Sequence, residues 1–280
     1  MISFQHASIT DTGRKRKENE DCVWSQVLSS PGAPPVGLFV VCDGMGGHMG
    51  GKFASYWAVE AVKHEFGDLF FTKDPRATLV LSKKDIDAAK RGTYNPPQPA
   101  EVDLEDLLHS AISKANSVVY DYARHKPKQA ANAGTTIATM AVRGEQAVIA
   151  NVGDSRVYLL RDHSLRQITH DHSLVANMVA EGQILPDEVF THPQRNMIYR
   201  FLGQKGDVMA DIFRERLQPG DQVLLCSDGL WEMIRSQQRM LDLIEKETDL
   251  QSACQRLVEE ANQAGGTDNI SVILVRITKG

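Results

Sequence analysis

The strongest constraint on the fold of this chain is an apolar run rich in valine, residues 36–42, that stops at Asp43 and continues into the glycine-rich segment 44–51. Such a run is typical of a buried strand, and the glycines mark the turn that ends it. A carboxylate at the end of a rigid strand has a fixed direction, and the glycines let the backbone approach whatever it binds. A second run, residues 221–227, ends in the same way at Asp228. We therefore expect the two strand ends to share one site.

Composition and charge narrow the class of protein. Hydrophobic residues make up 42% and charged residues 24% of the 280-residue chain, as in an ordinary globular protein. The formal net charge of -5 argues against nucleic-acid binding, because that binding depends on cations that neutralise phosphates. It fits a protein that gathers carboxylates around cations. The length allows one large domain or two small ones, and we expect a single domain over residues 1–280.

The beginning of the chain and the cysteines indicate the compartment. Residues 1–6 lack the basic and apolar segments of a signal peptide, and no apolar stretch reaches the roughly 20 residues needed to span a bilayer. We expect a cytoplasmic protein that does not contact a membrane. The four cysteines are far apart, and Cys42 and Cys226 lie inside apolar strand patterns. We therefore expect buried free thiols rather than disulfides or zinc ligands.

Helical and strand-like patterns alternate along the rest of the chain. Helical patterns cover residues 50–66, 104–119, 173–182 and 250–261, with Asp103 as a candidate N-cap. Short β-rich runs occupy residues 135–142, 146–152, 156–160, 165–168, 208–214, 223–227 and 270–277. Because short turns separate many of these runs, we expect antiparallel hairpins rather than helical crossovers. This predicts an α+β fold in which two antiparallel sheets pack face to face as a central sandwich flanked by helices.

Three details of this pattern are open to test. Trp57, in the first helix, is expected in the core. Residues 72–102 are rich in proline and show little periodicity, so we interpret them as a surface excursion. Residues 183–206 have no clean period, and both a mobile flap over the site and an irregular structural connection fit them.

Four aspartates stand beside strand patterns, next to glycine or asparagine: Asp43, Asp154, Asp228 and Asp268. Each one alone is compatible with a turn or a helix cap, and Asp228 with an N-cap. Together with Glu20 they form a carboxylate-rich set without His or Cys, which is the environment of Mg²⁺ or Mn²⁺. Two such ions bridged by one carboxylate would generate a hydroxide-like nucleophile and stabilise a displacement at phosphorus. Asp43 is the natural bridge, with Gly44 supplying a carbonyl.

The polar segment 11–21 contains four cations and four acids. One interpretation is a solvated loop, because charged runs usually lie on the surface. The other is that Glu20 or Asp21 helps to hold a metal while Arg16 offers its planar fork to a phosphate.

Six short motifs occur in order from Asp11 to about Ile277. They are D-x-G-x-x-R-x-x-N-E-D at 11–21, D-G-M-G-G-H at 43–48, A-G-T-T at 133–136, N-V-G-D-S-R at 151–156, S-D-G-L at 227–230 and G-G-T-D-N-I-S at 265–271. Any one of them is weak, whereas six in register are highly specific. Together they resemble the metal-dependent serine/threonine protein phosphatases of the type 2C (PPM) family, and in particular its bacterial branch.

The resemblance implies a role for each candidate residue. Asp43 would bridge two Mn²⁺ or Mg²⁺ ions, Gly44 would give its carbonyl to one of them, and Asp228 and Asp268 would complete the other. Glu20, with Asp21 as its neighbour, would act mainly through a metal-bound water. Asp154 with Asp228 would hold a weaker third ion, and Arg16 would bind the substrate phosphate.

The implied activity is hydrolysis of phosphoserine and phosphothreonine on proteins by in-line attack of water, without a phosphoenzyme. Met45 departs from the better-known eukaryotic members, which carry a histidine proposed as general acid at this place. Because a thioether cannot donate a proton, that role is vacant here or moves to metal-bound water. His48 lies close in sequence, but a lone histidine is more often structural.

The resemblance also implies partners, namely phosphorylated proteins and a serine/threonine kinase that the enzyme opposes, and we expect a monomer. Two further hypotheses are a regulatory binding module that keeps the fold without turnover and a metal phosphodiesterase that acts on nucleotides. Every expected acidic ligand is present, which argues against the first. A comparison of turnover on phosphoproteins with turnover on cyclic dinucleotides distinguishes the phosphodiesterase from the phosphatase.

Overall fold

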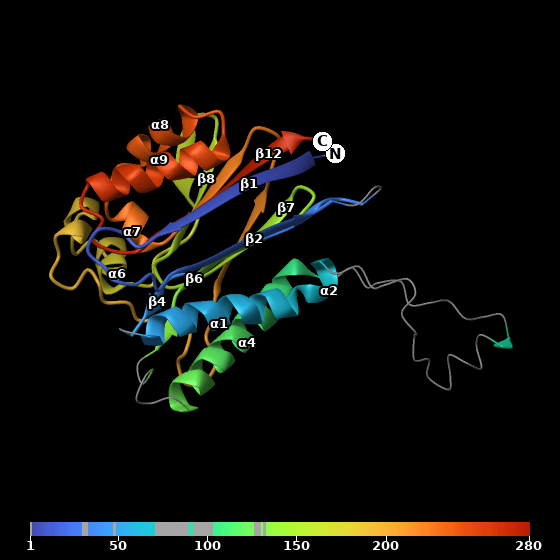
Figure 1. Ribbon diagram of the computed structural model, residues 1–280, viewed down its shortest axis with the longest axis horizontal. Coiled ribbons are helices and arrows are strands. Elements are labelled where there is room, and N and C mark those ends of the chain that lie inside the picture. Colours follow the sequence, from blue (N-terminus) through green and yellow to red (C-terminus); the bar gives the residue numbers. More distant parts are fainter. Residues whose placement is uncertain are drawn as a thin grey trace.

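The computed structural model describes residues 2–29, 33–46, 49–70, 90–91, 103–125, 130 and 133–280. Within these ranges the chain forms four layers, in the order helices, sheet, sheet and helices (Figure 1). The predicted excursion at residues 72–102 lies outside the described residues except for residues 90–91, and His48 lies outside them as well.

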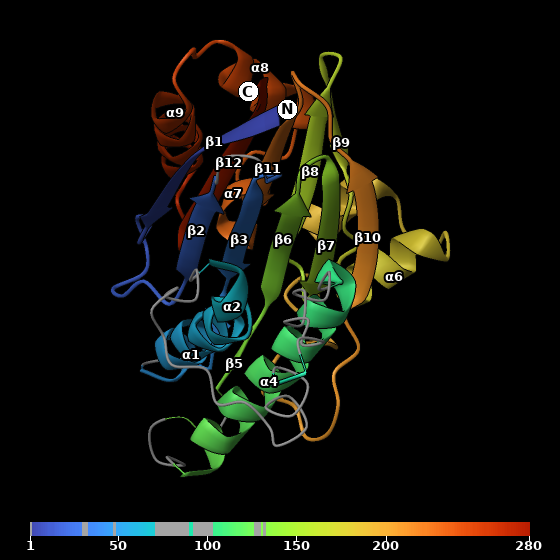
Figure 2. The ribbon, with the colours of Figure 1, turned by 90° about the vertical axis from the view of Figure 1, so that its right-hand side faces the viewer.

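Two five-stranded antiparallel sheets form the centre of the molecule. One has the strand order β1 (Ile2–Asp11), β12 (Ile270–Lys279), β11 (Gln222–Cys226), β8 (Arg156–Arg161) and β9 (Ser164–Gln167). The other, seen face on in Figure 2, has the order β10 (Asp211–Arg216), β7 (Gln146–Val152), β6 (Ile137–Arg143), β3 (Val36–Cys42) and β2 (Cys22–Leu28). A two-stranded ribbon, β4 (Gly44–Met45) with β5 (Gly134–Thr135), extends β3 and β6.

Strand β3 shows why this sequence forms a sandwich. Leu38, Val40 and Cys42 pack in the hydrophobic cluster under the helices, while Phe39 and Val41 pack in the cluster between the two sheets. Because successive side chains point to opposite faces of a strand, a run that is apolar at every position fits a strand covered on both faces. The predicted buried strand is therefore confirmed.

Helices cover the two outer faces of the sandwich (Figures 1 and 2). One face carries α1 (Met49–Glu65), α2 (Gly67–Phe70) and α4 (Leu104–His125), and the other carries α7 (Asp228–Trp231), α8 (Gln237–Glu245) and α9 (Leu250–Gln263). The Oδ1 atom of Asp103 accepts the amide of Glu105 at 2.8 Å, as expected of a residue that caps α4. None of the helices in the described ranges is long and apolar enough to cross a membrane.

The α+β class and the paired antiparallel sheets are confirmed, but several element bounds differ from the prediction. The strand expected at 208–214 begins only at Asp211, and the run at 135–142 is split at Thr136. Strands β1 and β2 and helix α8 were not predicted. Every residue of β2 is partly exposed, so this strand lacks the alternation that reveals a half-buried strand.

The prediction for Trp57 was wrong, because this side chain is 40% exposed. Helix α1 turns its small residues inward, and Ala54 and Ala58 are fully buried. Small side chains let the helix approach the sheet and α4 closely, which leaves the large rings on the outside. Trp57 instead packs edge-on against Tyr56, with ring centroids 5.3 Å apart.

The cysteines are free thiols, as predicted. Cys42, Cys226 and Cys254 are buried, and Cys22 is partly buried. Burial raises the pKa of the Cys226 thiol to about 12, so this side chain is neutral at physiological pH.

Candidate metal centre

Five aspartates lie at one end of the sandwich, each beside the end of a strand. Asp43 follows β3, Asp154 lies between β7 and β8, Asp228 follows β11 with one residue between, Asp268 precedes β12 and Asp21 directly precedes β2. The strand registers align these ends within each sheet: Cys42 pairs with Cys22 in one sheet, and Cys226 pairs with both Arg156 and Val272 in the other. A hydrogen bond from Ser227 to Asp21 joins the two groups. Acids separated by more than 200 positions in the sequence therefore meet because of the topology.

Burial, with a smaller contribution from neighbouring charges, raises the pKa of four of these carboxyls. The side chains of Asp43 and Asp228 are partly exposed to solvent. Even so, the surrounding protein makes burial the largest cause of their pKa shifts. Burial raises the pKa of Asp43 well above its usual value, and the charge of Asp21 raises it further. Burial and the charge of Asp154 raise the pKa of Asp228 in the same way. Chiefly through burial, the pKa of Asp21 rises to about 6 and that of Asp154 to about 7.

The backbone of Asp43 is fixed by the two threonines of the A-G-T-T motif. The amide of Asp43 donates to Oγ1 of Thr136 at 3.1 Å, and Oγ1 of Thr135 donates to the carbonyl of Asp43 at 2.8 Å. Both threonines are buried. The motif therefore acts by holding the strand end that carries the central acid.

A second set of hydrogen bonds joins the first site segment to the last. Oγ of Ser227 donates to Oδ2 of Asp21 at 2.8 Å. The side-chain amide of Asn269 donates to the carbonyls of Thr12 and Glu18, and its oxygen accepts the amide of Glu20. These contacts hold the segment before β2 against the loops after β11 and before β12.

Glycine is required at position 44 because two segments of backbone approach each other there. A Cβ atom at Gly44 would lie 2.2 Å from the carbonyl oxygen of Gly51 and 2.5 Å from that of Glu20. No side chain fits at such distances. The glycine cluster therefore lets the start of α1 and the segment before β2 pack directly against the strand end.

Arg16 lies at the rim of the acidic cluster. Its Nη2 atom pairs with Oδ2 of Asp268 at 2.5 Å, and the side chains are 50% and 30% exposed. The charges of Asp228 and Glu20 also act on this guanidinium. Arg16 is thus a cation beside the acids that is still open to solvent and to a ligand.

The donor atoms of the cluster suit a hard divalent cation. Oδ1 of Asp21 and Oδ1 of Asp228 are buried and have no hydrogen-bond partner among the described residues. In the same part of the chain, no three His, Cys, Asp or Glu side chains are already arranged to hold a metal ion. Because like charges repel, a divalent cation is what would draw these carboxylates into one ligand set.

The structure places Asp21, Asp154, Asp228 and Asp268 close enough to Asp43 for their charges to act on it. Glu20 and Asp21 are buried, whereas Arg16 is half exposed, so the segment 11–21 is only partly the solvated loop of the first interpretation. Ser227 and Asn269 lie within two of the predicted motifs, but no role was assigned to them, because their partners are more than 200 positions away. Met45 lies in β4, opposite Gly134.

Residues 173–206 form α6 (Leu174–Ala180), the short helix η1 (Pro186–Phe190) and turns. This segment packs beside α7: the ring of Phe190 lies 6.3 Å from that of Trp231, and Arg195 lies 3.9 Å from Glu232. An open pocket of about 780 Å³ lies between this segment and residues of β8, β9, β10, α7 and α8. The mobility expected of a flap stays a prediction.

Known proteins share both the sequence pattern and the fold. The family model described as protein phosphatase 2C matches residues 30–264. Serine/threonine phosphatase stp of Listeria monocytogenes is 34% identical over 95% of this chain and 93% of its own length. Protein phosphatase PhpP of Streptococcus pneumoniae is 32% identical over 97% of this chain and 96% of its own.

Among solved structures, the serine/threonine phosphatase PstP of Mycobacterium tuberculosis superposes with a TM-score of 0.78 at 29% identity, over 100% of both chains. The catalytic domain of PstP in complex with two manganese ions gives a TM-score of 0.77 at 29% identity, again over 100% of both chains. A family model that matches most of the chain, relatives over nearly their whole length and the common fold all agree. The chain belongs to the protein phosphatase 2C family.

Proposed function

We propose that the acidic cluster of this metal-dependent protein serine/threonine phosphatase is its catalytic centre and holds two Mn²⁺ or Mg²⁺ ions. Asp43 would bridge the ions, with the carbonyl of Gly44, Asp228 and Asp268 as further ligands, and Glu20 and Asp21 behind them. The observation that carries this proposal is the group of aspartates at the strand ends, in which one oxygen of Asp21 and one of Asp228 are buried without a hydrogen-bond partner among the described residues. Such a cluster is costly to bury without a cation.

Bound divalent ions would activate water and neutralise the charge that develops during in-line displacement at phosphorus. The protein's part is to position the phosphate and to keep the acids in place. Arg16 is half exposed and holds Asp268 by one nitrogen, so its planar fork can turn to a phosphate. We assign phosphate binding to Arg16. Met45 carries no exchangeable proton, so it takes no part in proton transfer.

Asp154 is the candidate for a third, weaker ion site shared with Asp228. Its charge raises the pKa of Asp228, so the two carboxyls are neighbours. Asp154 follows β7, and its turn is linked to Asp43 through Thr136, whose Oγ1 accepts the amide of Asp43 at 3.1 Å and is hydrogen-bonded to Oγ of Ser155 at 2.7 Å.

The relatives named as serine/threonine phosphatases support phosphorylated proteins as substrates. We further propose that the enzyme opposes a serine/threonine kinase, acts as a monomer in the cytoplasm and forms one catalytic domain over residues 1–280. Continuous pairing of the first strand with the last supports the single domain, because β1 and β12 are in register along their whole length.

Phosphate release from a phosphothreonine peptide, titrated with Mn²⁺ and with Mg²⁺, tests this function. We expect turnover that depends on either ion, stops with EDTA and is abolished in Asp43→Asn. Arg166→Lys, a change at an exposed residue of β9, is the control and should leave turnover unchanged. Release that survives EDTA would refute the metal site, and faster turnover on a cyclic dinucleotide would favour a phosphodiesterase.

A further inference from the structure

One tryptophan joins the two segments that carry Asp154 and Asp228. Helix α7 begins with Asp228 and ends with Trp231, so both residues belong to one short turn. The indole of Trp231 is buried, and its Nε1–H donates to the carbonyl oxygen of Asp154 at 3.0 Å. This hydrogen bond ties the backbone of one acid to the helix of the other, without using either carboxylate.

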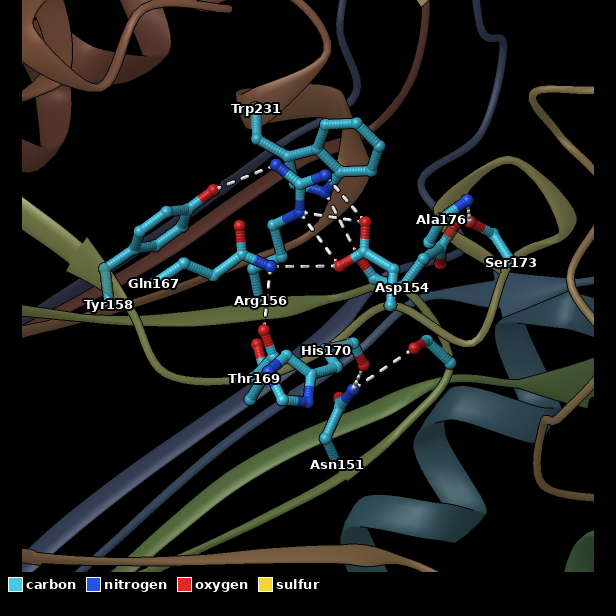
Figure 3. A network of polar contacts seen from close by, with 12 residues as sticks. Asn151, Asp154, Arg156, Tyr158, Gln167, Thr169, His170, Ser173, Ala176 and Trp231 are labelled. Carbon is cyan, nitrogen blue, oxygen red and sulfur yellow. Dashed lines mark hydrogen bonds and ion pairs between the residues drawn. The ribbon is translucent and has the colours of Figure 1, made fainter. Parts of the chain in front are cut away.

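The indole is itself held by the guanidinium of Arg156, which lies over the ring (Figure 3). The guanidinium carbon is 3.5 Å from the ring centroid, and the arginine side chain is 14% exposed. Nε and Nη2 of Arg156 donate to Asp171 at 3.0 and 2.6 Å, and Nη1 donates to the hydroxyl of Tyr158 at 3.2 Å. Because Asp171 and Tyr158 bind two edges of the guanidinium of Arg156, its plane is fixed and the same face always lies against the indole.

Pairing with Asp171 also cancels the charge of the arginine. Asp171 is almost fully buried, and Gln167 donates to its Oδ1 at 3.2 Å. An unpaired cation beside Asp154 would repel a divalent ion, and an unpaired carboxylate would add to the repulsion among the acids. The neutral pair therefore holds Trp231 without changing the net charge of the site.

The opposite side of the Asp154 turn is fixed by His172. The amide of Gly153 donates to Nδ1 of His172 at 2.9 Å, and the amide of His172 donates to the carbonyl of Gly153 at 2.9 Å. Thus the histidine holds the turn on the side of the β-sheet that contains β7. Trp231 holds it on the side of α7, where Asp228 lies.

We propose that Arg156, Asp171 and Trp231 form a positioning clamp that holds Asp154 against Asp228, so that these two carboxylates bind one divalent ion together. The inference rests on the proposed function, since it takes both acids as metal ligands. In this proposal the three clamp residues are not ligands of the ion and act through the backbone of Asp154 and the position of α7.

A calorimetric titration of the full chain with Mn²⁺ tests the clamp. Trp231→Phe keeps a ring and removes the N–H, and Arg156→Lys keeps the charge and removes the fork. Each should weaken one binding event by about tenfold, the usual effect of losing a group that orients a ligand, and weaken the other events less, since Asp228 is also a proposed ligand of the core ions. Asp154→Asn identifies that event by abolishing it. The matched controls Trp57→Phe and Arg166→Lys lie away from the cluster and should bind as the wild type.

A second measurement does not depend on bound metal. In EDTA, the indole N–H of Trp231 should exchange with solvent faster in Arg156→Lys than in the wild type, as seen by ¹⁵N NMR, because the ring is no longer held. The backbone amides of the buried strand β3, such as that of Phe39, serve as internal references. A variant that has merely lost stability would show faster exchange at these amides as well.

The outcomes separate the clamp from the proposed function. Unchanged Mn²⁺ binding in both Trp231→Phe and Arg156→Lys would overturn the clamp, as would a wild type in which no binding event depends on Asp154. Equal weakening of every event would also overturn it, because that result shows general destabilisation. A wild type that binds no divalent ion would overturn the proposed function itself.

Discussion

Arg16 connects the acidic cluster to solvent and is the residue at which metal binding and substrate binding are most easily separated. Its guanidinium is half exposed, whereas the acids behind it are held by buried hydrogen bonds. Removing it takes a cation from the rim and leaves the acids in place. Effects on phosphate binding and on metal binding should therefore differ.

We predict that Arg16→Ala raises KM for a phosphothreonine peptide by about 10- to 100-fold, because the phosphate loses a charge-assisted hydrogen bond. Mn²⁺ affinity should stay the same or increase, because Asp268 loses a competing partner. Steady-state kinetics and calorimetry measure the two effects. Unchanged KM would remove Arg16 from substrate binding.

At Gly44 the constraint is steric. We predict that Gly44→Ala costs about 2–3 kcal/mol of the free energy of unfolding, because the new methyl group meets the carbonyls of Gly51 and Glu20. Gly206→Ala is a control with open space around it but a positive φ of 88°, and it should cost about 1 kcal/mol from backbone strain alone. Urea unfolding measures both. Equal costs would show that the close approach at Gly44 does not matter.

At the scale of the element, strand β3 carries the site because both of its faces are anchored. Phe39 is fully buried between the sheets, where its ring lies 5.7 Å from that of His6. Leu38 and Val40 are anchored on the opposite face. A strand fixed on both sides gives Asp43 a fixed position at its end.

We predict that Phe39→Ala lowers the free energy of unfolding by about 3–5 kcal/mol, the usual cost of a large cavity in a core. Tyr56→Ala, on the exposed side of α1, should change it by less than about 0.5 kcal/mol. Chemical denaturation at equilibrium compares the two. A small loss for Phe39→Ala would mean that the sheet-to-sheet core readily collapses around the gap.

Elements with a strong hydrophobic period could be predicted from the sequence, and weakly patterned ones could not. Strand β12 and helices α4 and α9 bury a regular stripe or run. Strand β2 is partly exposed throughout, and its membership in the sheet depends on pairing with β3. The predicted burial of Trp57 was wrong because the spacing of apolar residues alone does not show which side of α1 faces the sheet.

The whole molecule explains why the site residues lie so far apart in sequence. Their gathering depends on strand registers within each sheet and on the packing of one sheet against the other, whereas the turn-and-strand context predicts a shared site only for Asp43 and Asp228. The contacts that hold them were not predictable, because Ser227, Asn269 and Trp231 act on residues distant in the chain. A periodic pattern shows which face is buried but not which hydrogen bonds cross the fold.

The raised pKa values have a consequence for stability. The folded chain holds protons on Asp21 and Asp154 up to about pH 6 and 7, whereas the unfolded chain releases them near the usual value of 3.8. Native protein then binds more protons than unfolded protein between these limits, so this contribution to stability falls as pH rises. A bound cation removes the penalty.

We predict that, in EDTA, Asp154→Asn has a higher Tm than the wild type at about pH 8 and that this difference shrinks at about pH 5.5, where Asp154 of the folded wild type is protonated. With saturating Mn²⁺ the order should reverse, since the variant loses a ligand. Calorimetric scans at the two pH values measure it. A difference independent of pH would show that the carboxyl does not titrate as its burial implies.

The most direct test of the metal centre is a calorimetric titration of the full-length wild type and of Asp43→Asn with Mn²⁺ at about pH 7.5, where the acids are available to a cation. We predict that the wild type binds at least two ions, as PstP does in its manganese complex, and that Asp43→Asn loses both of them while staying folded. A wild type without bound Mn²⁺, or an Asp43→Asn variant that keeps both ions, would contradict a centre built around Asp43.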